Sequence, residues 1–161
     1  MDGIYTEENS RYQIDLRKAL SSTEGLHDKY KAISNTLNDV DWIAETDDGI
    51  ILIEFTNYTE KPQPNNAGAK HEQIAKKYYG GMFYLMACDK TKPIDFVWIA
   101  ESPFLDSAVR KRYYSSIISR LPFELQKNQE IKRELLRKFQ VMSVSEWNKQ
   151  YPQFPLTQTM S

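Results

Sequence analysis

The chain has 161 residues, a formal net charge of −1 and 27% charged residues, which fits a single globular domain over residues 1–161. Its apolar runs are too short to cross a bilayer, and its N-terminus lacks the basic-then-apolar pattern of a secretory signal. The single cysteine, Cys88, excludes an internal disulfide framework, so we expect a cytoplasmic protein without a membrane partner.

The first half of the chain is predicted to contain helix followed by a β-hairpin. Residues 6–21 carry an apolar stripe at helical spacing, and a second short helix is expected over residues 23–33. Residues 40–46 and 50–57 have the composition of strands. The dipeptide Asp48-Gly49 between them is a strong hairpin-turn signal.

The second half of the chain alternates helices and strands. A helix is predicted over residues 69–88, and an almost continuously apolar strand over 94–101 is expected to be buried on both faces. Basic amphipathic helices are predicted over residues 105–121 and 130–139, and a final strand within 140–147. This order of elements predicts an α/β fold.

Two carboxylates of the hairpin share a face with core-forming side chains. With Asp48-Gly49 at the centre of the turn, Ile43 pairs with Glu54, and Asp41 becomes a diagonal neighbour of Glu54 at roughly 7–8 Å. A register slipped by one residue would separate the two acids. Unpaired charges beside apolar side chains are costly, and a divalent cation would remove that cost, so we expect Mg²⁺ or Mn²⁺ between them.

An Asp on one strand, a hairpin, and an acid in the next strand, followed by a helix and a further strand, together resemble the PD-(D/E)XK nucleases. The resemblance covers roughly residues 6–104. It implies a restriction-endonuclease-like α-β-β-β-α-β core, with a mixed sheet flanked by helices and extra helices at the C-terminal end. It also implies that Asp41, Glu54 and the backbone carbonyl of Phe55 hold Mg²⁺ or Mn²⁺. The implied function is an endonuclease that hydrolyses phosphodiester bonds of DNA, with RNA as the less favoured substrate.

The chain departs from the family pattern at two positions. Val40 stands where the motif has proline, and Thr56 stands where the motif has lysine. Thr56 supplies no positive charge. The alternative is therefore a catalytically inactive module of the same fold that binds nucleic acid or assembles with proteins. A third interpretation is an unrelated α/β domain in which Glu54 has a polar partner.

Family members are known to place the lysine on the following helix, so the helix at 69–88 is searched for a replacement. Lys70, Gln73 and Lys77 fall on one of its faces, at spacings of three and four residues. Lys70 is the favoured catalytic group because it lies nearest the helix start, where the dipole also favours an anion, and Lys77 is second. The alternative is that these are ordinary solvated side chains.

Further acids are candidates for the site. The family often carries an acid on its first helix, and Glu7, Glu8 and Glu24 are the candidates for it. Asp39 replaces Asp41 if the strand begins later. His71 has no partner placed near it in the sequence and is expected to be a surface or capping residue.

Charge is distributed unevenly along the chain. Residues 1–60 carry 13 acidic and 5 basic side chains, whereas residues 110–138 carry 9 basic and 3 acidic ones. This asymmetry is compatible with an acidic metal-holding centre flanked by a basic surface facing phosphates. The candidate contacts to nucleic acid are Arg110, Lys111, Arg112, Lys132 and Arg133. Many nucleases of this fold dimerise, so a homodimer or a subunit of a larger complex is an open expectation.

Overall fold

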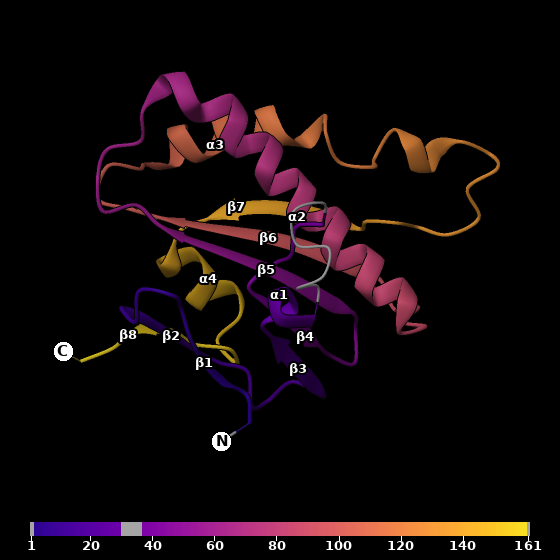
Figure 1. Cartoon of the computed structure of the whole chain (residues 1–161), viewed down its shortest axis with the longest axis horizontal. Coiled ribbons are helices and arrows are strands. Elements are labelled where there is room, and N and C mark those ends of the chain that lie inside the picture. Colours follow the sequence, from indigo (N-terminus) through magenta and orange to yellow (C-terminus); the bar gives the residue numbers. More distant parts are fainter. Residues whose placement is uncertain (1, 30–36, 161) are drawn as a thin grey trace.

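The structure is a computed structural model that describes residues 2–29 and 37–160 (Figure 1). Its strands and helices follow one another in a mixed order. They are β1 (Ile4–Thr6), β2 (Tyr12–Asp15), β3 (Ser21–Glu24), α1 (Leu26–Lys29), β4 (Trp42–Glu45), β5 (Ile50–Asn57), α2 (Ala67–Ala87), β6 (Ile94–Glu101), α3 (Ser107–Ile118), β7 (Lys138–Met142), α4 (Val144–Gln150) and β8 (Leu156–Gln158). Short 3-10 turns cover Pro64–Asn66 and Leu125–Lys127.

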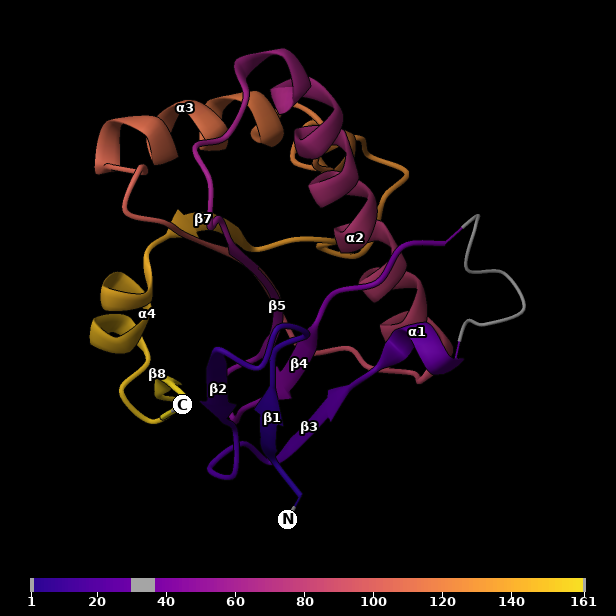
Figure 2. The same cartoon turned by 60° about the vertical axis from the view of Figure 1, so that its left-hand side comes forward.

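The strands form two sheets. The larger sheet has the order β3-β4-β5-β6-β7, with antiparallel pairs from β3 to β5 and parallel pairs from β5 to β7. The smaller sheet has the antiparallel order β1-β2-β8. Helices α2 and α3 cover one face of the large sheet, and α4 and the small sheet lie on the other (Figures 1 and 2). The predicted mixed α/β fold with a helix-flanked sheet is confirmed at this level.

Side-chain alternation in β5 assigns each residue to one of two cores. Ile50 and Leu52 pack toward α2, whereas Ile51 and Ile53 pack toward α4 and the small sheet. Because both faces of β5 and β6 are covered, these strands are buried along most of their length and are mainly apolar instead of alternating. The predictions of strands at 50–57 and 94–101 are therefore confirmed.

The predicted helix over residues 6–21 is wrong. That segment forms β2 and parts of β1 and β3, because its buried residues Tyr12, Ile14 and Leu16 alternate with period two and Leu20 is 61% exposed. Strand β2 pairs with β8 near the C-terminus, a partner that local periodicity does not reveal. In the predicted helix at 23–33, α1 forms over four residues, and residues 30–33 lie outside the described part of the chain.

The C-terminal part differs in a similar way. Residues 105–121 contain the predicted helix as α3, but the predicted helix at 130–139 is absent from the described structure. Its chain runs irregularly into β7, and the Gln126 side-chain oxygen accepts from the backbone N–H groups of Leu135 and Leu136 at 2.9 and 3.0 Å. Of the predicted strand at 140–147, only residues 140–142 are strand, as the end of β7, and α4 begins at Val144.

No helix within the described ranges combines the length and the apolar character that crossing a bilayer requires. Helix α2 is the longest at 21 residues, and it carries lysines and a glutamate along its first half.

Candidate functional site

The β4–β5 hairpin has a different turn from the predicted one. Its central residues are Asp47 and Asp48, and the backbone N–H of Thr46 donates to the carbonyl of Gly49 at 2.8 Å. Gly49 is required by a close approach, because a Cβ there would lie 2.6 Å from the carbonyl oxygen of Pro93. Gly49 thus allows the close packing against Pro93, while Asp48 stays in the turn, whose centre moves one residue toward the N-terminus.

This turn changes the register by two residues. Ile43 pairs with Leu52, so the predicted pairing of Ile43 with Glu54 is wrong. A shift of two residues keeps every side chain on its predicted face. Continuing the observed register by one pair beyond Trp42 and Ile53 brings Asp41 directly opposite Glu54, closer than the predicted diagonal arrangement.

Asp41 lies just before β4 and is anchored to β5. Its Oδ2 accepts from the backbone N–H of Phe55 at 2.8 Å, a bond that continues the ladder beyond the last residue pair. In an extended strand the N–H and C=O of one residue point the same way. The Phe55 carbonyl therefore faces the same side as Asp41, as the predicted ligand set requires.

Glu54 is the most buried carboxylate of the described chain, at 2% exposure. Its Oε1 accepts from Lys77 Nζ at 2.6 Å. Its Oε2 is also buried and has no hydrogen-bond partner within residues 2–29 and 37–160. A carboxylate oxygen without a partner in an apolar core carries a desolvation cost that nothing in the described structure offsets.

The electrostatics of the site reflect this burial. Burial and then the neighbouring Asp41 carboxylate raise the pKa of Glu54 to about 8, although the Lys77 ammonium opposes them. Burial also raises the pKa of Asp41, against Lys77 and the Phe55 amide. Burial alone would lower the pKa of Lys77, but the two carboxylates outweigh it and raise that pKa. The site therefore carries one cation against two acids that compete for charge.

The three polar candidates on α2 have different positions. Lys77 reaches the acids directly, and the Lys77 side chain is only 20% exposed. Lys70 is half-buried, and burial lowers its pKa against the attraction of Glu54 and Asp41, which places it within electrostatic range. Gln73 is exposed, in a shallow groove that Lys70 and Lys76 also line. Lys77, second in the order expected from the sequence, is thus the lysine in direct contact with Glu54, whereas Lys70 interacts with both acids electrostatically.

Thr56, at the position of the motif lysine, has a structural partner. Its hydroxyl accepts from Trp98 Nε1 at 3.0 Å across the β5–β6 pair. Trp98 is fully buried in the core under α2. The side chain at this position therefore satisfies the indole N–H and leaves the positive charge to α2.

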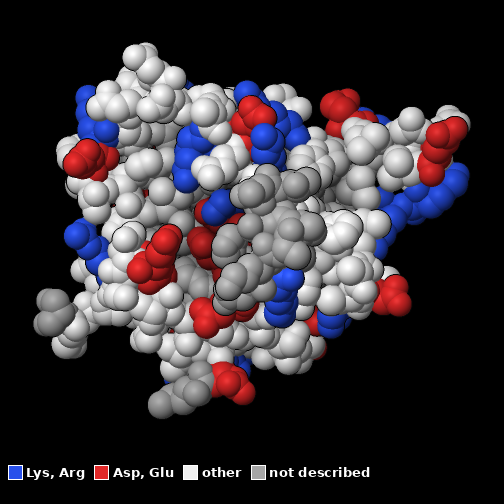
Figure 3. All heavy atoms as spheres, in the orientation of Figure 1, with Lys and Arg blue, Asp and Glu red and all other residues white. Residues whose placement is uncertain are grey.

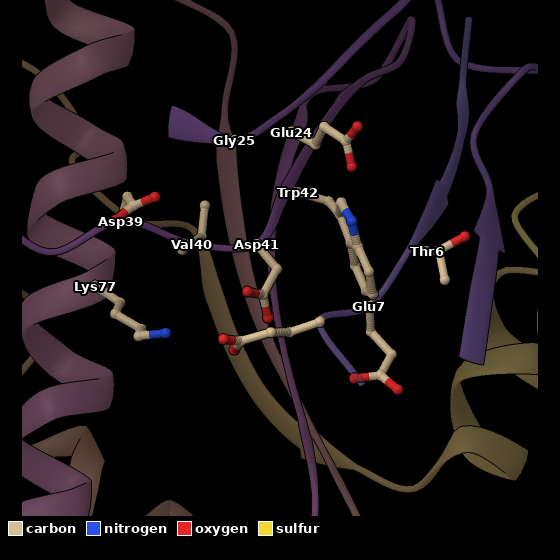
Figure 4. Close-up of a pocket in the computed structure, with 10 residues that line it drawn as sticks. Thr6, Glu7, Glu24, Gly25, Asp39, Val40, Asp41, Trp42 and Lys77 are labelled. Atoms are coloured by element: carbon tan, nitrogen blue, oxygen red, sulfur yellow. The ribbon is translucent and has the colours of Figure 1, made fainter. Parts of the chain in front are cut away.

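A cavity of about 490 Å³ opens beside Asp41 and Lys77 (Figure 4). Figure 4 shows the Lys77 side chain reaching from α2 toward the Asp41 carboxylate. Figure 3 shows Asp and Glu side chains gathered near the middle of this face, with Lys and Arg mostly above them over the helices. The lining residues are Thr6, Glu7, Glu8, Glu24, Gly25, Asp39, Val40, Asp41, Trp42 and Lys77.

The three acids expected from a first helix all line this cavity, although no helix carries them. Glu7 and Glu8 follow β1, and Glu24 ends β3. Glu7 is occupied by the β1–β2 turn, where its carboxylate accepts from the backbone N–H groups of Asn9 and Arg11 at 2.8 and 2.7 Å. Glu8 and Glu24 are exposed, so they are the acids that can turn toward a ligand in the cavity.

A ready-made cluster of three or more His, Cys, Asp or Glu side chains suited to a metal ion is absent from the described residues. The donors at hand are the carboxylates of Asp41 and Glu54 and the carbonyl of Phe55. These are hard oxygen donors of the kind that Mg²⁺ binds while keeping several waters. The unpartnered Glu54 Oε2 is an acceptor that such a cation would satisfy, so the residues present fit the ion.

Two of the predicted nucleic-acid contacts are tied into the protein. Arg110 is 7% exposed, and its Nε donates to the carbonyl of Ala100 at 3.0 Å. The guanidinium of Arg133 donates to the carbonyl of Lys90. Both side chains therefore have structural roles. The sequence alone does not show which of its basic residues bond within the protein and which lie free at the surface.

The remaining three predicted contacts are exposed. Lys111 and Arg112 lie on α3, and Lys132 donates to the carbonyl of Gln129 at 2.8 Å in the irregular segment before β7. These three side chains are free to meet an anionic partner at the surface.

Comparison with family profiles, curated proteins and solved structures finds no match for this chain. The Asp41–Glu54–Lys77 site is therefore the feature of the described chain that indicates a function.

Proposed function

We propose that the protein is a Mg²⁺- or Mn²⁺-dependent endonuclease-like enzyme that hydrolyses phosphodiester bonds of DNA. The observation that carries this proposal is Glu54, which is buried beside Asp41 with one oxygen on Lys77 and the other without a partner in the described chain. Such an arrangement is costly for stability, because an apolar side chain at the same place costs less, and acids with strongly shifted pKa values cluster at functional sites.

The order of elements supports the proposal. Strands β3, β4 and β5 form an antiparallel meander, α2 follows, and β6 returns parallel to β5. This agrees with the β-β-β-α-β part of the core that the PD-(D/E)XK resemblance implies. The helix expected before the first strand is replaced by β1 and β2.

The proposed division of roles follows from the donors. Asp41, Glu54 and the Phe55 carbonyl would hold the cation, which when bound supplies an acidified water and neutralises charge on the phosphate. Lys77 stands on the opposite wall of the site and supplies the positive charge that Thr56 lacks. Its ammonium is placed to stabilise a developing anion at the reacting phosphate.

Plasmid and single-stranded DNA cleavage in Mg²⁺ and in Mn²⁺ tests the proposal, with Glu54→Gln compared to Glu45→Gln. Glu45 is the matched control because it lies on the same face of the same hairpin and also pairs with lysine. We expect Glu54→Gln to abolish cleavage and Glu45→Gln to retain it. Equal cleavage by both variants would refute the assignment of Glu54.

Thr56 favours a second candidate, the inactive module of the same fold, because its hydroxyl is committed to Trp98. This candidate predicts no cleavage in either metal and no heat of Mn²⁺ binding in calorimetry. Cleavage that depends on Glu54 would eliminate it.

A further inference from the structure

Helix α2 carries two adjacent glycines, Gly80 and Gly81, in its middle, where glycine normally weakens a helix. Both are buried, but their neighbours differ. A Cβ on Gly80 would lie 1.4 Å from the carbonyl oxygen of Asn38 and 2.6 Å from its carbonyl carbon. The three atoms nearest to a Cβ on Gly81 would all belong to the Leu52 side chain, with its two terminal methyl groups at 3.1 Å and its Cγ at 3.6 Å.

The contact at Gly80 is with backbone, which cannot give way as a flexible side chain can. The chain at Asn38 therefore lies directly on α2 because Gly80 has no side chain. Three residues later this chain supplies Asp41, and the intervening Val40 is 1% exposed and packed into the core. The path from the glycine contact to the acid is short and fixed at both ends.

The same stretch of α2 carries the cation of the site. Lys77 precedes Gly80 by three residues, so the two lie on neighbouring positions of one helix face. One side of α2 thus presents the Lys77 ammonium to Glu54 and seats the segment that carries Asp41.

We infer that Gly80 is a positioning residue of the site: the missing side chain sets how closely Asp41 approaches Lys77 and the backbone of Phe55. The inference deepens the proposed function and rests on it for its catalytic meaning. The geometric part concerns the Asp41 segment alone and holds or fails without a metal.

The test compares Gly80→Ala with Gly81→Ala by amide hydrogen exchange and NMR on metal-free protein. Both variants gain the same helix propensity, so they differ only in what the new methyl group meets. In Gly80→Ala the segment at Asn38 must move, and the Phe55 N–H loses its bond to Asp41. We expect its exchange to accelerate about tenfold or more relative to Ile53, the scale of a lost bond to a charged acceptor. Gly81→Ala should leave this ratio unchanged, and an unchanged ratio in Gly80→Ala would overturn the inference.

A second measurement covers the case in which Gly80→Ala does not fold. In the wild-type protein, the Gly80 Hα that points along the missing Cβ should show an NOE to the backbone N–H of Asp39, whose nitrogen lies 3.5 Å from the Cβ position. Absence of that NOE would contradict the close approach directly.

Mn²⁺ calorimetry on the folded variants separates this inference from the proposed function. If the wild type binds Mn²⁺, Gly80→Ala should bind it about tenfold or more weakly, and Gly81→Ala should bind as the wild type does. If the wild type binds no Mn²⁺ but the Phe55 amide responds as expected, the positioning role stands and the metal-dependent function fails. Full Mn²⁺ affinity in Gly80→Ala would overturn the positioning role while leaving the metal site in place.

Discussion

The two ends of the β4–β5 hairpin each carry a glutamate on the same face, with opposite consequences. At the turn end, Glu45 accepts from Lys90 at 2.7 Å and lies 3.0 Å from Lys92, and these lysines lower its pKa to about 2. At the open end, Glu54 has Lys77 as its ion-pair partner within the described residues, and burial raises the pKa of Glu54 to about 8. One end is a satisfied surface ion cluster, and the other is short of positive charge.

The difference shows what distinguishes a structural ion pair from a site in this fold. Glu45 has more positive partners than its one charge needs and is partly exposed, so it requires nothing further. Glu54 shares one ammonium with Asp41 and keeps a buried oxygen without a partner in the described residues. The lack of positive charge around Glu54 and Asp41, more than the mere presence of an acid and a lysine, indicates a place for an additional cation.

The largest effect on cleavage is expected when Lys77, the cation in contact with Glu54, is replaced. Lys77→Met should lower kcat/KM for Mg²⁺-dependent DNA cleavage by about 10²–10³-fold, because a preorganised positive group is lost from a buried site. Lys90→Met at the turn end is the control and should change the rate by less than about twofold, the size of surface effects.

Steady-state cleavage of a labelled duplex measures both variants, and Lys70→Met completes the set. Wild-type rates in Lys77→Met with a large loss in Lys70→Met would move the catalytic charge about two turns toward the start of α2. That outcome would restore the order expected from the sequence, in which Lys70 comes first.

The next effect concerns stability and pH in the metal-free protein. The folded pKa of Glu54 is about 8 and its ordinary value is 4.5, so between these values the folded state binds more protons than the unfolded state. The free energy of unfolding should therefore fall as pH rises from about 4.5 to about 8, by up to about 1.4 kcal/mol per pH unit for this one group.

Urea unfolding at intervals across this range measures the slope. Glu54→Gln removes the titrating group and should flatten the profile, with the largest gain over wild type on the alkaline side. Glu45→Gln should leave the wild-type slope intact in this range, because Glu45 titrates well below it. Parallel slopes for Glu54→Gln and wild type would show that Glu54 is ionised throughout.

The elements that surround the Asp41–Glu54 site could largely be predicted from local sequence. Strands β5 and β6 and helix α2 have apolar patterns that only buried elements carry, and Glu54 stands out within one of them. Asp41 and Glu54 lie on one face of the hairpin, as predicted. The observed register differs from the predicted one by two residues, and a shift of two leaves every side chain on the same face.

The remaining features depend on contacts between segments far apart in sequence. The turn position follows from the carbonyl of Pro93, which excludes a Cβ at Gly49. Strand β2 forms between β1 and β8, and β8 reaches it from the other end of the chain. The choice of Lys77 over Lys70 depends on where α2 crosses β5, and Gly80 sets how closely the Asp41 segment approaches. No local pattern encodes these distances.

The smallest expected effect is the loss of thermal stability when Glu45, at the turn end of the hairpin, is replaced. Glu45→Gln should lower Tm by no more than about 3 °C, because partly exposed ion pairs contribute little to stability. The effect should shrink further in 1 M NaCl, where the Debye length is about 3 Å and exposed charges are screened. The stability change caused by Glu54→Gln should persist in the same salt, because Glu54 is buried away from the solvent ions.

Thermal unfolding of both variants at pH 8, in low and high salt, measures this contrast. Equal salt sensitivity at Glu45 and Glu54 would mean that solvent ions reach the open end as easily as the turn end, and that the charge shortage at Glu54 is relieved by counterions without a bound metal.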